Sequence, residues 1–370
     1  MKSDKIRAAI IGFAHMHVNE IALYISEEEN MELCACADIS PKVHELSDSR
    51  YTRSWNIQNV RKNYCDKFYD DYKSMLDSET PDVVFLITET VNKLEVVREC
   101  AKRKINICVE KPLAMSYDEA LEIRDIADKS GIEIIVNWPL VWRGYLHTVK
   151  SILDSGKVGT LKKLRFLLGH TGPLGAGASH RGVNTAAELL SDEEKASLWW
   201  YRKSEGGGAI LDFCCYGCML TRWYLDEVPE SVKAVGMNLG HSFADIIDNG
   251  IAIVKYNSSV SVLEGTWTSP QKAVPPGPTL YCSDGAIECV RDGDAVKVRT
   301  YDIFGNIIET EDIALAPEFK NIAAMYAYHA TTGNPVHHTL TLENNIKIMA
   351  LLDAITRSAE RNDDSEAVRE

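Results

Sequence analysis

Apolar runs alternate with amphipathic segments along the first third of the chain. Residues 6–12 (IRAAIIG) form an apolar run that ends in glycine, and residues 31–38 (MELCACAD) form a second run that ends in an acid. Continuous apolar runs of this length are typical of strands buried on both faces of a parallel sheet. The segment between them, residues 17–26, is amphipathic at helical spacing. The pattern predicts a strand–helix–strand unit.

The same alternation continues to about residue 137. Residues 81–88 (PDVVFLIT), 105–109 (INICV) and 131–136 (GIEIIV) are further apolar runs, and residues 92–104 and 117–130 between them are helical in pattern. Ser116, followed three residues later by Glu119, marks the start of the second helix. Strands that alternate with helices predict a doubly wound parallel sheet, so we expect an α/β domain of the Rossmann type over residues 1–137.

After Trp138 the period of the pattern changes from helical to alternating. One helix is expected at 147–155 and a last one at 342–361. Between them, runs with strand patterning are separated by Gly, Asn or Asp, at residues 162–168, 232–239, 251–256, 260–266, 286–290 and 295–301. Such spacing predicts a second, C-terminal α+β domain over residues 138–370, with an open and largely antiparallel sheet.

Composition and charge narrow the class of protein. A chain of 370 residues exceeds the roughly 250–300 residues of a single core, which agrees with two domains. The formal charge of −14 argues against a nucleic-acid partner, because that binding draws on clustered Lys and Arg. No run reaches 18 apolar residues and the first residues lack a signal-peptide pattern, so we expect no membrane partner and a cytoplasmic location.

The ten cysteines are expected to be unpaired thiols, since a reducing cytoplasm disfavours disulfides. Cys214, Cys215 and Cys218 form the sequence CCYGC, whose spacing is compatible with zinc. No second Cys or His pair at ligand spacing follows nearby, so the sequence predicts no metal site.

The turn after the first strand carries a dinucleotide signal. In GFAHMH the first glycine, Gly12, is kept, while Ala14 and His17 stand where the motif G-x-G-x-x-G has its second and third glycines. His15 and His17 are compatible with a metal motif, or with phosphate, substrate or solvent contacts. Asp38, 26 residues after Gly12, suits the ribose hydroxyls and favours NAD over NADP, unless it only caps a helix.

Glu110, Lys111 and Pro112 follow the strand INICV, at the sheet edge where open α/β folds bind ligands. With VEKPLAMSYDEA, GGGAILD (206–212), EGTW (264–267) and LLDAITRSAE, the chain resembles the Gfo/Idh/MocA family of oxidoreductases. The resemblance implies a Rossmann domain, a substrate domain with an open sheet, NAD or NADP as cofactor, and a homodimer or homotetramer. The expected dinucleotide contacts are Gly12, Phe13, Ala14, His15, Asp38, Thr88, Glu110 and Lys111.

By motif position, the resemblance implies that Lys111 binds a substrate hydroxyl beside the nicotinamide and that Asp212 faces the same place. The sequence departs from the family at two positions: Tyr216 stands where a histidine is usual four residues after Asp212, and Lys93 stands where many members carry another histidine. We therefore hypothesise three catalytic residues, Lys111, Asp212 and Tyr216.

Tyr216 needs a lowered pKa to act as acid and base, because tyrosine starts near 10 and histidine near 6.5. Lowering its pKa to about 8 requires roughly 2.7 kcal/mol, which a nearby Lys111 ammonium can supply. The alternatives are that Tyr216 only packs and Lys111 carries the proton, or that His170 or His180 replaces the missing histidine. Substrate contacts are expected from residues 169–177, which include His170, and from Trp199 or Trp200, although both tryptophans also suit a core.

The sequence therefore predicts an NAD(P)-dependent oxidoreductase acting on a secondary hydroxyl of a sugar, cyclitol or related polyol. Two alternatives remain: an NAD-dependent glycosidase that oxidises its sugar transiently, and a catalytically silent dinucleotide sensor. Net accumulation of NADH distinguishes the first interpretation from the other two.

Overall fold

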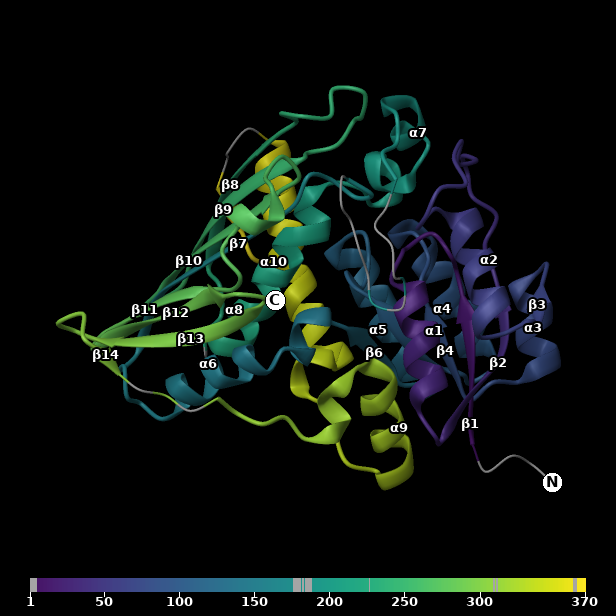
Figure 1. Cartoon of the computed structure of the whole chain (residues 1–370), viewed down its shortest axis with the longest axis horizontal. Helices are drawn as coiled ribbons and strands as arrows, with labels where there is room; N and C mark the ends of the chain where they lie inside the picture. Colours follow the sequence, from purple (N-terminus) through teal and green to yellow (C-terminus); the bar gives the residue numbers. More distant parts are fainter. Residues whose placement is uncertain are drawn as a thin grey trace.

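The structure, a computed structural model, describes residues 5–175, 181, 183, 188–225, 227–308, 310, 312–361 and 365–370. Two sheets dominate it, and they lie on opposite sides of the long helix α10 (Leu342–Glu360) (Figure 1). Helix α10 packs against α5 (Tyr117–Ser130) of the first half, and against α8 (Cys215–Tyr224) and β8 (Ser231–Met237) of the second. The last helix of the chain therefore joins the two halves.

The first sheet has the strand order β3-β2-β1-β4-β5-β6 in the described residues, and every neighbouring pair is parallel. This confirms the predicted doubly wound α/β sheet. Its strands are β1 (Ile6–Ile11), β2 (Met31–Ala37), β3 (Phe68–Tyr69), β4 (Val83–Leu86), β5 (Asn106–Glu110) and β6 (Ile134–Asn137). Its helices are α1 (Val18–Glu27), α2 (Arg53–Asn63), α3 (Tyr72–Glu79), the short η1 (Thr90–Asn92), α4 (Lys93–Lys102) and α5.

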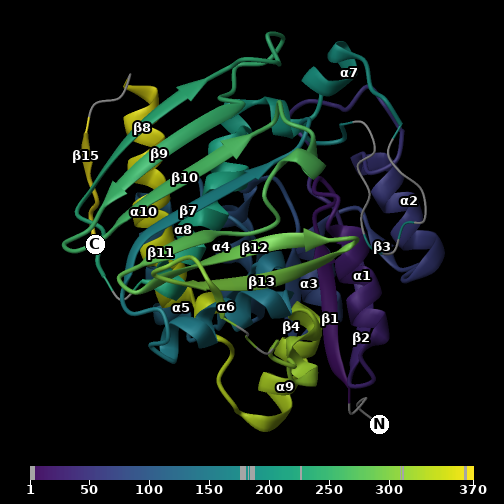
Figure 2. The same cartoon turned by 60° about the vertical axis from the view of Figure 1, so that its left-hand side comes forward.

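The second sheet has the order β14-β13-β12-β11-β7-β10-β9-β8-β15 in the part of the chain that the structure describes. Only β7 and β10 pair in parallel among these neighbours, so the predicted largely antiparallel sheet is also confirmed. The strands are β7 (Leu161–Gly169), β8, β9 (Asn249–Lys255), β10 (Val260–Thr266), β11 (Thr279–Cys282), β12 (Gly285–Asp292), β13 (Ala295–Asp302), β14 (Ile307–Ile308) and β15 (Glu366–Ala367). Helices α8 and α10 lie behind this sheet, and its other face carries no helix of the described ranges (Figure 2).

Short helices connect the two sheets and bring the second half onto the first. In chain order they are η2 (Pro139–Trp142), α6 (Gly144–Asp154), α7 (Asp192–Ala196), η3 (Trp199–Tyr201), η4 (Lys203–Glu205), the π-helical turn η5 (Ile210–Cys214), η6 (Gln271–Ala273), η7 (Pro317–Lys320), α9 (Ile322–Thr332) and η8 (His338–Leu340). Helix α9 returns to pack on α1 of the parallel sheet, although it follows β14 in the chain. At the carboxyl edge of the parallel sheet, Trp199 of η3 contacts Ala14 and Asp212 of η5 contacts Lys111. This seam between the two halves holds the candidate site.

Among the described residues, no helix is both long enough and apolar enough to cross a membrane. The ten cysteines all lie in this part of the chain, and none of them forms a disulfide.

Candidate functional site

The turn after β1 requires the glycine that the sequence singled out. Gly12 has a φ of +95°, and a Cβ there would lie 2.7 Å from the Cβ of Thr88, which follows β4. The backbone N–H of Gly12 donates to the carbonyl of Ala37 at the end of β2 (3.0 Å). Since only glycine fits both this backbone and this contact, the chain turns tightly from β1 toward α1, whose N-terminal end carries the partial positive charge of the helix dipole.

Asp38 lies beside this turn and is held by two partners. Its Oδ1 accepts the backbone N–H of Phe13 at 3.0 Å, and Arg53 donates to Oδ1 at 2.6 Å and to Oδ2 at 2.7 Å. Arg53 also bonds Glu89, so one guanidinium joins two carboxylates. Burial raises the pKa of Asp38 more than Arg53 lowers it. Asp38 is therefore not a simple helix cap.

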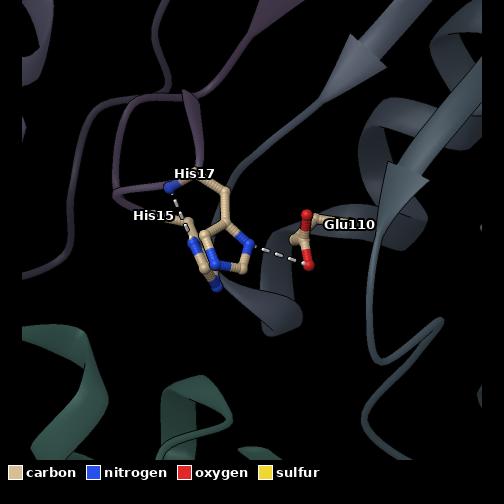
Figure 3. Close-up of side chains that lie close together, drawn as sticks. All are labelled: His15, His17 and Glu110. Atoms are coloured by element: carbon tan, nitrogen blue, oxygen red, sulfur yellow. Dashed lines mark hydrogen bonds and ion pairs between the residues drawn. The ribbon is translucent and has the colours of Figure 1, made fainter. Parts of the chain in front are cut away.

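The imidazole of His17, in the turn after β1, points toward the carboxylate of Glu110 (Figure 3). His17 has a helical φ of −61°, so the missing third glycine costs no backbone strain. Its Nδ1 lies 3.3 Å from Oε1 of Glu110, and its backbone N–H donates to Nδ1 of His15 at 3.1 Å. The ring of His15 lies 4.2 Å from that of His17, centroid to centroid. The structure thus joins the turn to the end of β5.

Glu110 is fully buried and is fixed from several sides. Its Oε2 accepts the side-chain N–H of Asn137 at 2.9 Å, and its carbonyl accepts Nζ of Lys93 at 2.6 Å. Lys93 also donates to the carbonyl of Pro112 at 2.5 Å. Burial lowers the pKa of Lys93 to about 7, despite the opposing charge of Glu110. Lys93 therefore positions the backbone on both sides of Lys111.

Lys111 reaches across the seam to the second half of the chain. Its Nζ lies 2.7 Å from Oδ1 of Asp212 and 3.0 Å from the carbonyl of the same residue, and both side chains are at most 9% exposed. The indole N–H of Trp267 donates to Oδ2 of Asp212 at 3.3 Å. Although burial lowers the pKa of Lys111, Asp212 and the other acids raise it more, so the pKa ends well above its usual value. The two motif residues thus form a buried ion pair.

Tyr216 lies against the same ammonium, but with its ring rather than its hydroxyl. Nζ of Lys111 stands 4.7 Å from the centre of the Tyr216 ring, a cation–π contact. Burial raises the pKa of Tyr216, and Lys111 opposes that shift only in part. The direction is opposite to the lowering that we hypothesised, because desolvation of the phenolate outweighs the attraction of one lysine. At neutral pH the Tyr216 hydroxyl keeps its proton.

The remaining predicted residues surround this centre. Trp199 is buried, stacks on Trp200 with ring centroids 3.9 Å apart, and donates its indole N–H to the carbonyl of Ala14 at 3.0 Å. It therefore contacts the turn after β1. The rings of His170 and Phe213 lie 4.7 Å apart, centroid to centroid, in an edge-to-face arrangement, and Phe213 follows Asp212 in the chain. His180 and residues 176 and 177 of the expected substrate segment lie outside the described residues.

Sequence reasoning missed Arg53, Glu89 and Asn137, named Lys93 only as a departure from the family, and did not link His17 to Glu110. Each of these partners lies 15 to 93 residues away from the group it contacts. An isolated charge on a helix start, such as Arg53 or Lys93, is more often a solvated surface residue. The one sequence feature that pointed to any of these residues was Lys93 itself, which stands where many members of the family carry a histidine.

Comparisons with known proteins agree with this geometry. The family model described as "Oxidoreductase family, NAD-binding Rossmann fold" matches residues 6–138, and that of the "GFO/IDH/MocA C-terminal domain" matches residues 146–288. A D-xylose 1-dehydrogenase (NADP(+)) from Haloferax volcanii is 22% identical, over 79% of this chain and 82% of that protein. The uncharacterized oxidoreductase YrbE from Bacillus subtilis is also 22% identical, over 61% of this chain and 60% of its own length.

Two solved structures share the whole architecture. The WlbA dehydrogenase from Chromobacterium violaceum, in complex with NADH and UDP-GlcNAcA, superposes with a TM-score of 0.75 at 16% identity, over 100% of this chain and 97% of that one. The myo-inositol 2-dehydrogenase from Lactobacillus plantarum gives a TM-score of 0.73 at 16% identity, over 99% of this chain and 100% of that one. Identities this low show a common fold.

Proposed function

Because the chain belongs to the GFO/IDH/MocA oxidoreductase family, we propose that it transfers a hydride between a nicotinamide dinucleotide and a secondary hydroxyl of a sugar, cyclitol or related polyol. The observation that carries this proposal is the buried pair of Lys111 and Asp212, 2.7 Å apart, at the carboxyl edge of the parallel sheet. In open α/β folds this edge is where ligands bind. The relatives named for sugars, such as the D-xylose dehydrogenase, support the substrate class.

The residues of the turn after β1 fit a dinucleotide. Gly12 provides the close backbone approach, and the dipole at the start of α1 favours the negative charge of a pyrophosphate. Asp38 is aligned by the N–H of Phe13, as a carboxylate that accepts ribose hydroxyls needs to be. When bound, the nicotinamide supplies the hydride acceptor or donor.

We favour NAD over NADP from the charges around Asp38. Two carboxylates, Asp38 and Glu89, share the single guanidinium of Arg53, so their local charge is net negative. The extra phosphate of NADP would add negative charge to this group, which costs free energy at short range. The carboxylate of Glu45, which accepts the backbone N–H of Arg53, adds to the effect when ionised.

Lys111 and Tyr216 have different tasks in the proposed reaction. Lys111 stays protonated and donates a hydrogen bond to the substrate oxygen, and Asp212 keeps its ammonium in place. An ammonium next to that oxygen stabilises the negative charge that develops when the hydroxyl loses its proton. Tyr216 also stays protonated, so we assign it a hydrogen-bond donor role and not that of a base.

The proposed homo-oligomer would use the uncovered face of the second sheet. Val235 and Met237 on β8 and Ile251 and Ile253 on β9 all point to this face and are 50–53% exposed. A patch of adjacent apolar side chains on one sheet suits a second copy related by a two-fold axis. Light scattering should then give at least twice the chain mass, and Ile251→Glu should reduce it to the monomer.

The reaction is tested by following NADH absorbance with a panel of sugars, inositols and glycosides, with NADP in parallel. We expect one polyol to give NADH, and Lys111→Ala to lose the signal while Lys347→Ala, an exposed lysine paired with Glu343, keeps it. If no substrate of the panel gives NADH although the protein binds NAD, the proposal is contradicted. Release of an aglycone without net NADH would instead indicate a glycosidase.

A further inference from the structure

His17 and Glu110 form a second titratable pair in this seam, separate from Lys111 and Asp212. Nδ1 of His17 lies 3.3 Å from Oε1 of Glu110, and Oε2 of Glu110 is held by Asn137 at 2.9 Å. Because Lys93 also fixes the Glu110 backbone, the carboxylate has little freedom to turn away. An imidazole with one nitrogen against a fixed carboxylate leaves its other nitrogen, Nε2, as the proton-accepting atom.

His15 supports this arrangement and argues against a metal ion. His15, His17 and Glu110 bring their possible ligand atoms within 4.8 Å of one another. However, Nδ1 of His15 accepts the backbone N–H of His17, so in the neutral ring the proton lies on Nε2. A metal-bound histidine normally shows the reverse, with its second nitrogen donating a hydrogen bond. The neutral His15 ring is therefore assigned as a donor through Nε2.

His17 has a path for its proton. Its side chain is 14% exposed, whereas those of Glu110 and Lys111 are 1% and 3% exposed. A base must return its proton to solvent after each turnover, which a partly exposed imidazole can do. Lys111 and Tyr216 both stay protonated at neutral pH and cannot take up another proton.

We propose that His17, oriented by Glu110, is the general base of this site and accepts the hydroxyl proton of the substrate on Nε2. The inference rests on the proposed function. As the carbon–hydrogen bond gives its hydride to the nicotinamide, the oxygen–hydrogen bond gives its proton to His17. The carbon–oxygen bond becomes a carbonyl, and in the reverse direction His17 returns the proton.

The charges around His17 agree with this role. Burial lowers its pKa, but Glu110 on β5 and Glu20 on α1 together raise it more, while the Lys111 ammonium opposes them. The net shift is upward from 6.5, toward neutral pH, where a general base is most effective. The opposing effect of Lys111 is felt because its ammonium shares the seam with the imidazole.

The experiment compares His17→Ala with wild type on the polyol that gives NADH, with and without added imidazole. Loss of a general base should reduce kcat/KM by about 100-fold or more. Imidazole should restore part of the rate in His17→Ala, since the deletion leaves space next to Glu110, and NAD affinity, from quenching of protein fluorescence, should change little. His329→Ala is the matched control: His329 pairs with Glu133 at 2.9 Å, outside the seam, so its loss should change neither rate nor response to imidazole.

The pH profile gives a second readout. Wild-type kcat/KM should fall below an apparent pKa above 6.5, as His17 becomes protonated, and this limb should be lost in His17→Ala and shift to lower pH in Glu110→Gln. Activity of His17→Ala within about threefold of wild type would overturn the inference, as would imidazole rescue of His170→Ala instead. Stoichiometric zinc, with activity lost to a chelator, would make the cluster a metal site and also overturn it. If the wild type forms no NADH with any polyol of the panel, the proposed function is overturned as well.

Discussion

Asp212→Asn should destabilise the folded protein, because it removes the charge that balances a buried lysine. The substitution keeps the size of the side chain, and the main-chain carbonyl of residue 212 still accepts from Nζ of Lys111, so the change isolates the charge. Both side chains of the native pair are at most 9% exposed. Removing one partner of a buried ion pair costs about 3–5 kcal/mol of folding stability. Because the carbonyl of residue 212 and Glu110 still face Lys111, we expect a loss near the lower end, about 3 kcal/mol.

The sign of the pH dependence follows from the pKa of Lys111. In the native protein this pKa is raised above 10.5, so its stabilisation is complete below that pH and is lost only as pH rises through the folded value. Without Asp212, the groups that oppose burial, Glu110 among them, raise the pKa of Lys111 less, so we expect the folded pKa to fall below 10.5. The unfolded state then binds more protons below about pH 10.5, and the stability deficit of Asp212→Asn should shrink as pH rises from about 7 to 9.5.

Urea unfolding of wild type, Asp212→Asn, Lys111→Met and the double variant measures both effects. We expect a deficit of about 3 kcal/mol near pH 7, and a double variant more stable than the sum of the two single losses implies. Asp154→Asn is the control, since its exposed pair with Lys150 should contribute less than about 1 kcal/mol. A deficit for Asp212→Asn below about 0.5 kcal/mol, or one that is constant with pH, would refute the reasoning.

Three further predictions concern the neighbouring groups. The folded pKa of Lys93 is about 7 against 10.5 unfolded, so the stability of wild type relative to Lys93→Met should rise between about pH 7 and 9, measured by urea midpoints; a flat difference would contradict this burial. Asp38→Asn frees Arg53 and should shift the ratio of kcat/KM for NAD over NADP toward NADP by about tenfold, and an unchanged ratio would exclude Asp38 as a selector. Trp199→Phe removes the donor to the carbonyl of Ala14 and should weaken NADH binding by about fivefold in a fluorescence titration. Unchanged NADH affinity would show that this hydrogen bond does not contribute to binding.

The fold was predictable where local signals and burial agreed. Helix α5 has the predicted limits, since Ser116 accepts the N–H of Glu119 at its start and Gly131, with a φ of +72°, ends it. Helices α2 and α9 were missed for opposite reasons. The sequence of α2 is almost wholly polar, and α9 is apolar around most of its circumference, so neither shows one apolar face.

The site was predictable only in part, because its chemistry depends on contacts between distant residues. Motif resemblance brought Lys111 and Asp212 together, and Gly12 was recognisable from its turn alone. The direction in which the pKa of Tyr216 shifts was not predictable, since it depends on burial and on whether the Lys111 ammonium faces the ring or the hydroxyl. The motifs indicate that Lys111 lies near Tyr216, but they do not indicate whether its ammonium contacts the ring or the hydroxyl.

The end of β5 positions the groups for two tasks of the proposed reaction, which are to accept the proton of the substrate hydroxyl and to bind its oxygen. Successive side chains at the end of a strand point to different sides, so Glu110 faces His17 and Lys111 faces Asp212. Lys93 binds the carbonyls before and after Lys111, which fixes both directions at once. A shift of this backbone would therefore separate the proposed base and the oxygen-binding ammonium together. The structure thus couples the two groups mechanically, and a loss at Lys93 should affect both.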